Sequence, residues 1–370
     1  MSGAAGALAI NGRFLTQATT GVQRFAAEVT RAADLLAGEG AWPAARVLVP
    51  PAAGPPPADA YRHLRVEAFG TRRGQAWEQI DLPRAAGAGT LLLNLGNTAP
   101  LLAGRRQAVV IHDAGIFDTP ESYALPFRAW YRGLHHALAR TGARLLTVSE
   151  FSRGRIARHL GVPPDRLGVV HEGGEHVLRE PADGGVLARH GLAPGRFALV
   201  VGTQAAHKNL AALEEAAGLL AARGMTLAVA GGGGAAGLFR AADGVGGVRP
   251  LGRVTDAELR ALYEAALCLV FPSRYEGFGL PPLEAMRCGC PVVAAAAGAV
   301  PEVCADAALW FDADGPRRPA EAILRLLEEE GLRDRLRTAG LARAARFSWR
   351  RAALTLLDLV RRPEGEARTA

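Results

Sequence analysis

The sequence predicts an α/β protein of two Rossmann-like, doubly wound domains, each with a parallel sheet covered by helices. Short apolar runs alternate with helical periodicity along most of the chain, as expected when helices connect parallel strands. The 370 residues are enough for two domains of ordinary size, each with its own core. A polar stretch at 172–185, with two pairs of adjacent glycines, interrupts the alternation and predicts the linker between the domains.

In the first half, apolar runs of strand length alternate with two helical segments. The predicted strands lie at 8–10, 46–49, 90–93, 108–111, 145–148 and 167–170, and the predicted helices at 22–36 and 127–140. The small apolar start of the chain has no basic segment, so a first strand is expected there and not a signal peptide. One stripe of the second helix predicts a face packed on the core, and it contains Phe127, Trp130, Tyr131, Leu134 and Leu138.

The second half repeats the alternation. Its predicted strands lie at 197–201, 226–230, 267–271, 291–294 and 309–311, and its predicted helices at 210–223, 256–265, 282–288, 320–329, 332–347 and 347–360. Two such units joined by a glycine-bearing linker imply a cleft between them. Ligands of these folds bind beyond the carboxyl ends of the strands, so the loops that follow the strands are the places to look for functional residues.

Composition narrows the class of protein. An apolar fraction of 49%, without an uncharged apolar run of about 18 residues, predicts a soluble protein with no membrane span. The four cysteines lack the paired spacing of a zinc site, so reduced thiols and a cytoplasmic location are expected.

The chain is basic, with a formal net charge of +7. The segment from Arg128 to Arg166 contains eight arginines and three histidines against two acidic residues. Such a segment can face an anionic membrane, an anionic substrate or nucleic acid, or it can be a solvated helix face. No nucleic-acid-binding motif accompanies it, so nucleic acid is not expected as a partner.

A single lysine, Lys208, stands among 43 lysine and arginine residues. A compact ammonium on a flexible stem suits a point contact to phosphate, whereas arginine presents a planar fork. Lys208 follows an apolar run, a glycine and a polar loop and precedes a helical segment, which is where anion sites form in α/β units. The alternative is chance retention of one lysine in an arginine-rich composition.

Two carboxylates, Glu276 and Glu284, have seven residues between them. Glu276 lies in a loop after a predicted strand, and Glu284 lies in the first turns of a helix that begins near two prolines, which fit a first helical turn. Gly277 and Gly279 leave backbone N–H groups bare at the helix N-terminus, where a diphosphate can bind. Glu284 is then placed to hold a ribose hydroxyl.

The run from Glu276 to Ala285, followed by residues 289–293 and 298–303, resembles the retaining GT-B glycosyltransferases of family 4. Upstream, Gly202 with the segment 207–209 resembles the phosphate loop of that family, residues 230–233 its glycine turn, and residues 251–256 its loop beside the nucleobase. The resemblance covers residues 197–310 almost continuously. In the first half it is sparser. Residues 11–13 and 20–24 resemble the glycine loop after the first strand, and residues 21–24 resemble mannosyl- and rhamnosyltransferase-like members. Residues 147–152 resemble a further signature, and His112 follows a strand where the family places a histidine near the transferred sugar.

The resemblance implies a GT-B fold with an acceptor domain over 1–180, a nucleotide-sugar domain over 181–346 and a last segment, 347–370, that crosses back to the first domain. It implies His112, Lys208 and Glu276 as catalytic residues, with domain closure completing the site. The donor-binding positions that it implies are Gly21, Gly202, Thr203, Lys208, Arg253, Val254, Glu276, Gly277, Phe278, Gly279, Leu280 and Glu284.

The implied activity is retaining transfer of a hexose, mannose or similar, from a nucleotide-diphosphate sugar to a saccharide or lipid-linked acceptor. Cell-envelope polysaccharide or glycolipid synthesis is the expected setting, with GDP-mannose as the donor and no metal or other cofactor. The protein is expected to be cytoplasmic, and the basic segment would allow peripheral association with the inner face of the plasma membrane.

The sequence departs from the family pattern at Thr203, where many members carry a phosphate-binding arginine, and at Ala205-Ala206-His207, where proline and arginine are common. Diphosphate neutralisation would then depend on Lys208 and backbone amides, with help from Arg253 or Arg274. The Asp312-Ala313-Asp314 triplet has the form of a metal-binding motif of the other glycosyltransferase fold, but it follows a late strand and is predicted to be a turn.

Three alternatives stay open. A GT-B sugar-nucleotide epimerase or phosphorylase shares the fold but consumes donor differently. A basic nucleic-acid-binding protein is the alternative outside enzymes. A non-catalytic scaffold that kept the fold is a third, and the presence of Lys208, Glu276 and Glu284 argues against it.

Overall fold

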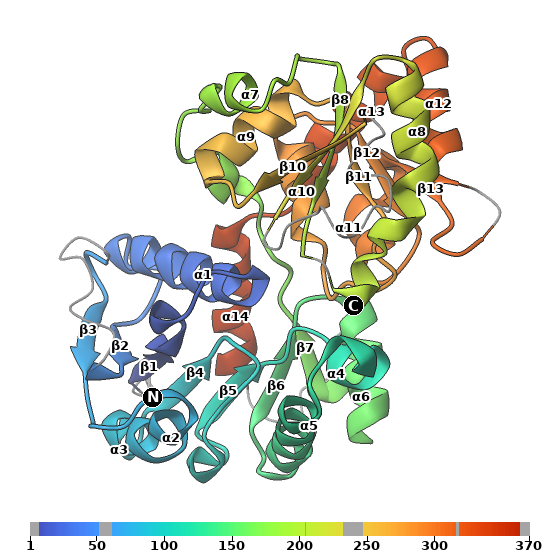
Figure 1. Ribbon diagram of the computed structural model, residues 1–370. Coiled ribbons are helices and arrows are strands. Elements are labelled where there is room, and N and C mark those ends of the chain that lie inside the picture. The colour runs from blue at the N-terminus through green and yellow to red at the C-terminus, as the bar shows by residue number, and fades with distance from the viewer. Residues whose placement is uncertain (1–6, 52–60, 204, 232–246, 316–317, 363–370) are drawn as a thin grey trace. The chain divides into compact units, whose positions relative to one another are not determined.

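The computed structural model describes residues 7–51, 61–203, 205–231, 247–315 and 318–362 (Figure 1). The chain forms two compact units: Met1–Glu172 together with Trp349–Ala370, and Gly173–Ser348. The chain therefore passes between the units at 172/173 and 348/349, whereas the expected positions are 180/181 and 346/347. The segment Trp349–Ala370 belongs to the first unit.

The first unit contains a seven-stranded sheet with the order β3-β2-β1-β4-β5-β6-β7, all of whose pairs are parallel. Its strands are β1 (Leu8–Asn11), β2 (Ala45–Val49), β3 (Arg65–Ala68), β4 (Leu91–Asn94), β5 (Gln107–Val110), β6 (Arg144–Thr147) and β7 (Leu167–Val169). The central strands are buried on both faces, because helices cover both sides of a parallel sheet. The prediction missed β3, a charged edge strand that lacks an apolar run.

The helices of the first unit are α1 (Gly21–Gly38), α2 (Gly74–Ala76), α3 (Leu82–Ala86), α4 (Gly115–Asp118), α5 (Leu125–Arg140), α6 (Glu150–Leu160) and α14 (Trp349–Arg361), with a π-helical turn, η3 (Trp77–Asp81), and 3-10 turns η1 (Gly12–Thr16), η4 (Leu101–Ala103), η5 (Pro120–Ser122) and η6 (Pro164–Arg166). The prediction omitted α6, although the sequence has a helix-capping residue at each end of it. The Ser149 side chain accepts the Ser152 N–H at the start, and Gly161 ends the helix with φ +65°.

The last helix, α14, packs on α1. The rings of Phe25 and Trp349 meet edge to face at 6.0 Å between centroids. Arg350 and Glu39 form a two-pronged ion pair at 2.7 and 2.8 Å. These contacts bring a segment that follows the whole second unit in sequence into the fold of the first.

One face prediction for α5 was wrong in its first half. Leu134 and Leu138 are buried as expected, with 3% and 0% exposed. Phe127 and Trp130 are 43% and 42% exposed, and Leu125 is 67% exposed. The apolar stripe therefore continues past the end of the core onto the surface, which helical periodicity alone does not reveal.

The second unit contains a six-stranded parallel sheet with the order β10-β9-β8-β11-β12-β13. Its strands are β8 (Phe197–Val201), β9 (Thr226–Ala230), β10 (Val248–Gly252), β11 (Cys268–Phe271), β12 (Val292–Ala295) and β13 (Ala308–Phe311). The prediction missed β10, which contains Pro250 and lies at the sheet edge, where proline is tolerated.

The helices of the second unit are α7 (Gly185–Arg189), α8 (Glu214–Ala222), α9 (Asp256–Ala265), α10 (Leu280–Arg287), α11 (Val300–Cys304), α12 (Pro319–Glu328) and α13 (Leu332–Ala344), with 3-10 turns η7 (Glu175–Leu178), η8 (Ala206–Lys208), η9 (Leu210–Leu213) and η11 (Ala305–Ala307). Figure 1 shows α8 and α12 on one face of the sheet and α9 and α10 on the other. A continuous apolar core joins α8, α12 and the sheet.

Both sheets confirm the predicted doubly wound fold. In each, the strand order reverses direction between two central neighbours, β1 and β4 in the first sheet and β8 and β11 in the second. Loops that follow such neighbours diverge and leave a crevice at the carboxyl edge, where ligands bind. In the part of the chain that the structure describes, no helix is long and apolar enough to cross a membrane.

Candidate functional site

Lys208 and Glu276 meet at the carboxyl edge of the second sheet. The Nζ atom of Lys208 donates to Oε1 of Glu276 at 2.6 Å. Lys208 follows β8 and Glu276 follows β11, the two strands between which the strand order reverses. The ammonium also lies 5.7 Å from the centroid of the Phe271 ring at the end of β11. The structure thus brings together two of the three residues expected to be catalytic.

The loop that carries Lys208 is fixed at its far end by Asn209. Asn209 has a left-handed backbone, with φ +54°, and its Nδ2 donates to the Ala313 carbonyl at 3.1 Å. A short polar side chain tolerates this conformation better than most residues do. Thr203, where an arginine is common in the resembled family, is exposed, and Gln204 lies outside the described residues.

Gly202 and Gly231 lie against one another at the ends of β8 and β9. A Cβ on Gly231 would stand 1.8 Å from the Gly202 carbonyl oxygen, and Gly231 has φ +145°. Only glycine fits both the contact and the backbone angle. The rest of the expected glycine turn, 232–233, lies outside the described residues.

The backbone of Glu276 is held by the turn that precedes α11. The Ala299 N–H donates to the Glu276 carbonyl at 3.1 Å. A Cβ on Gly298 would stand 2.7 Å from the Glu276 nitrogen, and Gly298 has φ +61°. The glycine at 298 therefore permits the close approach that fixes the position of Glu276.

Gly279, with φ +111°, is the N-cap of α10, so the helix begins at Leu280, slightly before the predicted start. Pro281 and Pro282 have no backbone N–H, so Leu280 supplies the one amide donor of the first three helical residues. Phe278 is buried and packs edge to face on Phe347 at 5.8 Å. An anion at this end would be bound by loop amides and the helix dipole together.

Glu284 lies one turn further along α10 than Leu280 and is 7% exposed. Its Oε1 lies 2.8 Å from Nε2 of His176, and its Oε2 accepts the Tyr263 hydroxyl at 3.0 Å. Sequence reasoning did not identify either partner. Tyr263 resembles an ordinary core position of α9, and His176 lies in the polar stretch assigned to the linker; two glutamates and two histidines within 171–176 were the available signal.

The other expected donor contacts are more exposed. Arg253 and Val254 follow β10, and the Arg253 side chain is exposed. Arg274, considered a second cation for the diphosphate, forms two-pronged hydrogen bonds with Asp314 at 2.6 to 3.0 Å. This interaction raises the pKa of Arg274 and lowers the pKa of Asp314. Asp314 lies in a bend after β13 and is used as an ion-pair partner.

His112 follows β5 in the first unit and is 4% exposed. Its backbone N–H donates to Oδ1 of Asn97 at 2.7 Å, and its Nε2 lies 2.9 Å from the Leu95 carbonyl, which requires a proton on Nε2. Its Nδ1 lies 3.7 Å from Oε1 of Glu172. Phe25 packs edge to face on the ring at 4.8 Å. The imidazole is thus held in one orientation.

The resembled glycine loop of the first unit is partly buried. Gly21 begins α1 and is exposed, with room for a side chain. Arg13 is buried and donates to Glu78 at 3.2 Å and to Thr98 at 2.8 Å. Asn11 also donates to Glu78, at 2.7 Å, so the carboxylate is held at the carboxyl end of β1.

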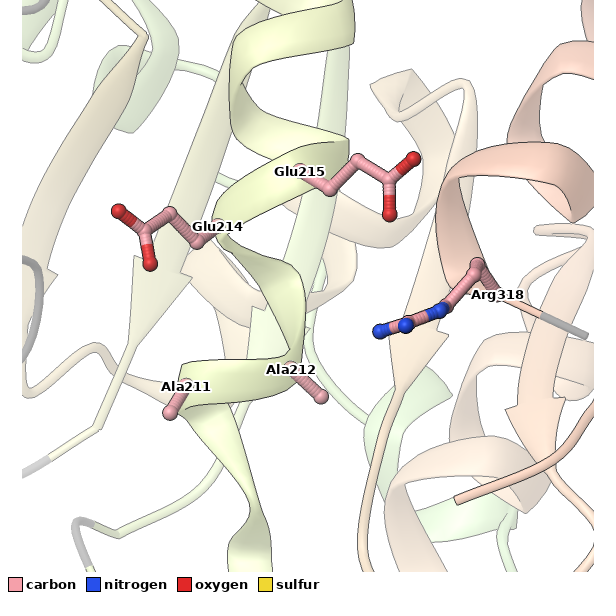
Figure 2. A pocket seen from close by; sticks show the side chains of 5 residues that line it. All are labelled: Ala211, Ala212, Glu214, Glu215 and Arg318. Carbon is pink, nitrogen blue, oxygen red and sulfur yellow. The ribbon is translucent and has the colours of Figure 1, made fainter. Parts of the chain in front are cut away.

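A surface depression beside α8 contains none of the expected site residues. Figure 2 shows its lining, in which Glu215 and Arg318 point toward one another and Glu214 points to the other side of the helix. Ala211 and Ala212 complete it. Its acidic side chains are exposed, which does not suit an anionic ligand.

Comparison with known proteins gives consistent matches. A family model described as glycosyl transferases group 1 matches residues 190–343. The O-antigen chain mannosyltransferase B of Escherichia coli is 36% identical over 256 residues, which are 66% of this chain and 67% of that protein. Sucrose-phosphate synthase from Thermosynechococcus elongatus has a TM-score of 0.71 at 18% identity, covering 96% of this chain and 98% of that one. Anabaena Alr3699/HepE in complex with UDP and glucose has a TM-score of 0.71 at 18% identity, covering 95% and 98%.

Proposed function

Because the chain belongs to the glycosyl transferases group 1 and is a glycosyltransferase of the GT-B fold, we propose that it transfers a hexose from a nucleotide-diphosphate sugar. The proposed acceptor is a saccharide or a lipid-linked saccharide of the cell envelope. The observation that carries the proposal is the Lys208–Glu276 pair, at 2.6 Å, beside the amides that lead into α10. A single ammonium beside the backbone of a helix N-terminus, at a strand-order reversal, suits a diphosphate.

The reaction breaks the bond between the anomeric carbon and the diphosphate oxygen, and the acceptor oxygen bonds to that carbon on the same face. The acceptor proton leaves with the departing diphosphate. Negative charge develops on the diphosphate, and Lys208 with the amides near Gly279 stabilises it. A preorganised donor of this kind contributes on the order of 3 kcal/mol to the barrier. No divalent ion is needed in this scheme.

The other site residues have binding roles in the proposal. Glu276 holds sugar hydroxyls or the diphosphate region, Glu284 holds the ribose, and His112 contacts the transferred sugar. The backbone N–H of Arg274 donates to the His207 carbonyl at 2.8 Å, so Arg274 is held beside the Lys208 loop, where its guanidinium pairs with Asp314. In the proposal, a diphosphate that displaces Asp314 would let this guanidinium assist Lys208, in place of the arginine that many family members carry at the position of Thr203.

The proposed donor is GDP-mannose. The support is the match to a mannosyltransferase at 36% identity and the resemblance of the first-half glycine loop to mannosyl- and rhamnosyltransferases. Anabaena Alr3699/HepE, which has a similar fold, was solved with UDP and glucose, so the test below includes a uridine donor.

The test is incubation of the purified chain with GDP-mannose, UDP-glucose and dTDP-rhamnose, followed by thermal shift and by assay of nucleoside diphosphate release. We expect stabilisation by at least one donor, release that persists in EDTA, and an α-linked product from an α-linked donor. A folded protein that neither binds nor consumes any nucleotide sugar would overturn the proposal. Loss of activity in EDTA with recovery in Mg²⁺ would overturn its metal-independent part. Inversion of the anomeric centre on transfer would overturn the retaining mechanism, whereas a free epimerised sugar would favour the epimerase.

We propose that the first unit docks on the inner face of the plasma membrane, at the cytoplasmic side, where a lipid-linked acceptor is available. Phe127 and Trp130 lie three residues apart on α5, on one side of the helix, and both are exposed; they are called here the α5 patch. Part of the basic segment serves the fold, since Arg155 forms an ion pair with Asp118. The arginines at 140, 158 and 166 are exposed and can face anionic lipid.

A further inference from the structure

Glu284 is bound on both carboxylate oxygens by side chains that have no part in the function proposed above. We propose that Tyr263 and His176 are positioning residues, which hold the Glu284 carboxylate in the orientation that accepts the donor ribose hydroxyls. The inference builds on the proposed function, because it assumes that Glu284 binds ribose. Tyr263, His176 and Glu284 are 0%, 3% and 7% exposed, and they come from α9, η7 and α10.

The hydrogen-bond capacity of the carboxylate supports this role. Two carboxylate oxygens offer about four lone-pair sites. The Tyr263 hydroxyl uses one on Oε2, and Nε2 of His176 uses one on Oε1. A carboxylate oxygen can accept from a protein donor and from a ribose hydroxyl at the same time. Burial raises the pKa of Tyr263 well above its usual range, and the charge of Glu284 raises it further, so the phenol remains a donor.

The hydrogen bonds from Tyr263 and His176 should reduce the free-energy cost of binding ribose, because they order the Glu284 side chain in advance. A glutamate side chain loses substantial rotamer freedom when a ligand orders it, and that loss weakens binding. In this structure the loss occurs on folding, because two donors already fix the carboxylate. A ribose therefore binds to an acceptor that is already aligned.

The position of His176 is specified by its surroundings. A Cβ on Gly174 would lie 2.8 Å from the Leu283 side chain, so a bare glycine lets η7 lie against α10 beside Glu284. Arg287, one turn beyond Glu284, lies 3.9 Å from Glu175. The two residues before His176 thus lie against Leu283 and Arg287, which flank Glu284 in α10, and this places the imidazole beside Glu284.

The test compares nucleotides with and without ribose hydroxyls. Calorimetry would give the Kd of GDP, UDP and their 2′,3′-dideoxy counterparts for the wild type, Tyr263→Phe and His176→Ala. We expect each substitution to weaken binding of the better ribonucleotide about tenfold, the size of one lost hydrogen bond to a charged group. The dideoxy counterpart should lose less than about twofold, since it makes no bond to Glu284.

Two controls separate positioning from general damage. His176→Gln keeps an N–H donor and should restore ribonucleotide binding relative to His176→Ala, whereas Tyr61→Phe, in the first unit, should change nothing. An equal loss for ribose and dideoxy nucleotides, or no loss at all, would overturn the positioning role and leave the proposed function intact. A folded wild type that binds no nucleoside diphosphate would overturn both.

Discussion

The ammonium of Lys208 lies 2.6 Å from Oε1 of Glu276, although the two residues are 68 positions apart in the sequence. Their side chains are only 18% and 14% exposed, so water and salt screen the pair less than they screen a surface ion pair. Each charge therefore compensates the other before a donor binds. A diphosphate that binds Lys208 must share the ammonium with Glu276 or displace it.

Glu276→Gln removes the competing charge and should separate binding from catalysis. We expect the variant to bind GDP or UDP at least as tightly as the wild type, because Lys208 is released toward the phosphates. Turnover should fall about 100-fold, because the carboxylate no longer holds the reacting region. Isothermal titration and a release assay would measure the two effects. Weaker nucleotide binding together with normal turnover would contradict the competition.

Lys208→Met removes the ammonium and keeps much of the apolar stem. Nucleotide affinity and turnover should both fall, with kcat reduced by about 100- to 1,000-fold, the usual effect of removing one preorganised donor. The matched control is Arg223→Met, which also removes one positive charge from the second unit, beside Glu328 at 3.6 Å. Equal kinetic effects of the two substitutions would show that only net charge matters.

Gly298→Ala should displace Glu276 because the added Cβ would stand 2.7 Å from its backbone nitrogen. Gly191→Ala is a matched control, since Gly191 has φ +59° against +61° at Gly298 and has open space around it. Both substitutions carry the strain of a left-handed alanine, about 1 kcal/mol of unfolding free energy. Only Gly298→Ala should also lower turnover, by at least about tenfold. Parallel urea titrations and rate assays distinguish the outcomes.

The free energy of unfolding of the first unit should depend on pH through His135. Burial lowers the pKa of this imidazole to about 4, although its hydrogen bond to the Asn97 carbonyl opposes the shift. Between pH 6.5 and about 4, the imidazole is protonated in the unfolded chain and neutral in the folded chain. The free energy of unfolding should therefore fall as the pH decreases from about 6.5 to 4, by on the order of 3 kcal/mol. His135→Gln should flatten this dependence in urea titrations at pH 7 and 5, and an unchanged slope would refute the assignment.

The α5 patch should contribute to lipid binding. Replacing Phe127 and Trp130 by serine should weaken partition onto phosphatidylglycerol vesicles by at least about tenfold, because each aromatic ring loses its apolar contact with the bilayer. Leu35→Ser is the control, since Leu35 is 56% exposed on α1. Vesicle sedimentation at 0.1 M salt would measure the effect. Equal binding of all three proteins would exclude the patch.

Part of the site could be predicted because functional loops of this fold follow the carboxyl ends of the central strands. Lys208 and Glu276 both follow apolar strands, and a doubly wound sheet places the loops after those two strands at its crevice, so their proximity follows from the pattern. His176 comes from an irregular turn, where neither periodicity nor a strand end indicates a partner. Tyr263 was not identified because it fits the helical periodicity of α9, so an aromatic residue at this buried position is read as core packing.

The surface of the fold was predicted less well than its centre. The edge strands β3 and β10 contain charges and a proline, because an edge needs to avoid pairing with other chains more than it needs burial. The stripe on α5 extends beyond the core that covers its second half, so Phe127 remains exposed. Periodicity reports which residues share a face, and only the neighbouring elements decide how far that face is covered.

On each side of the first passage of the chain between the units, a side chain makes a buried contact within its own unit. Glu172 lies 3.7 Å from Nδ1 of His112, and four residues later His176 meets Glu284 at 2.8 Å. The first contact lies within the first unit and the second within the second unit.

The return passage has the same property. Phe347 packs on Phe278, and two residues later Trp349 packs on Phe25, whose ring meets that of His112. Each of the two passages therefore lies between one residue in contact with the first unit and one in contact with the second. These contacts involve residues of the proposed donor site, such as His112 and Glu284, or residues next to them. Under the proposed function, a ribose bound to Glu284 would therefore act, through His176, on the chain only four residues from Glu172.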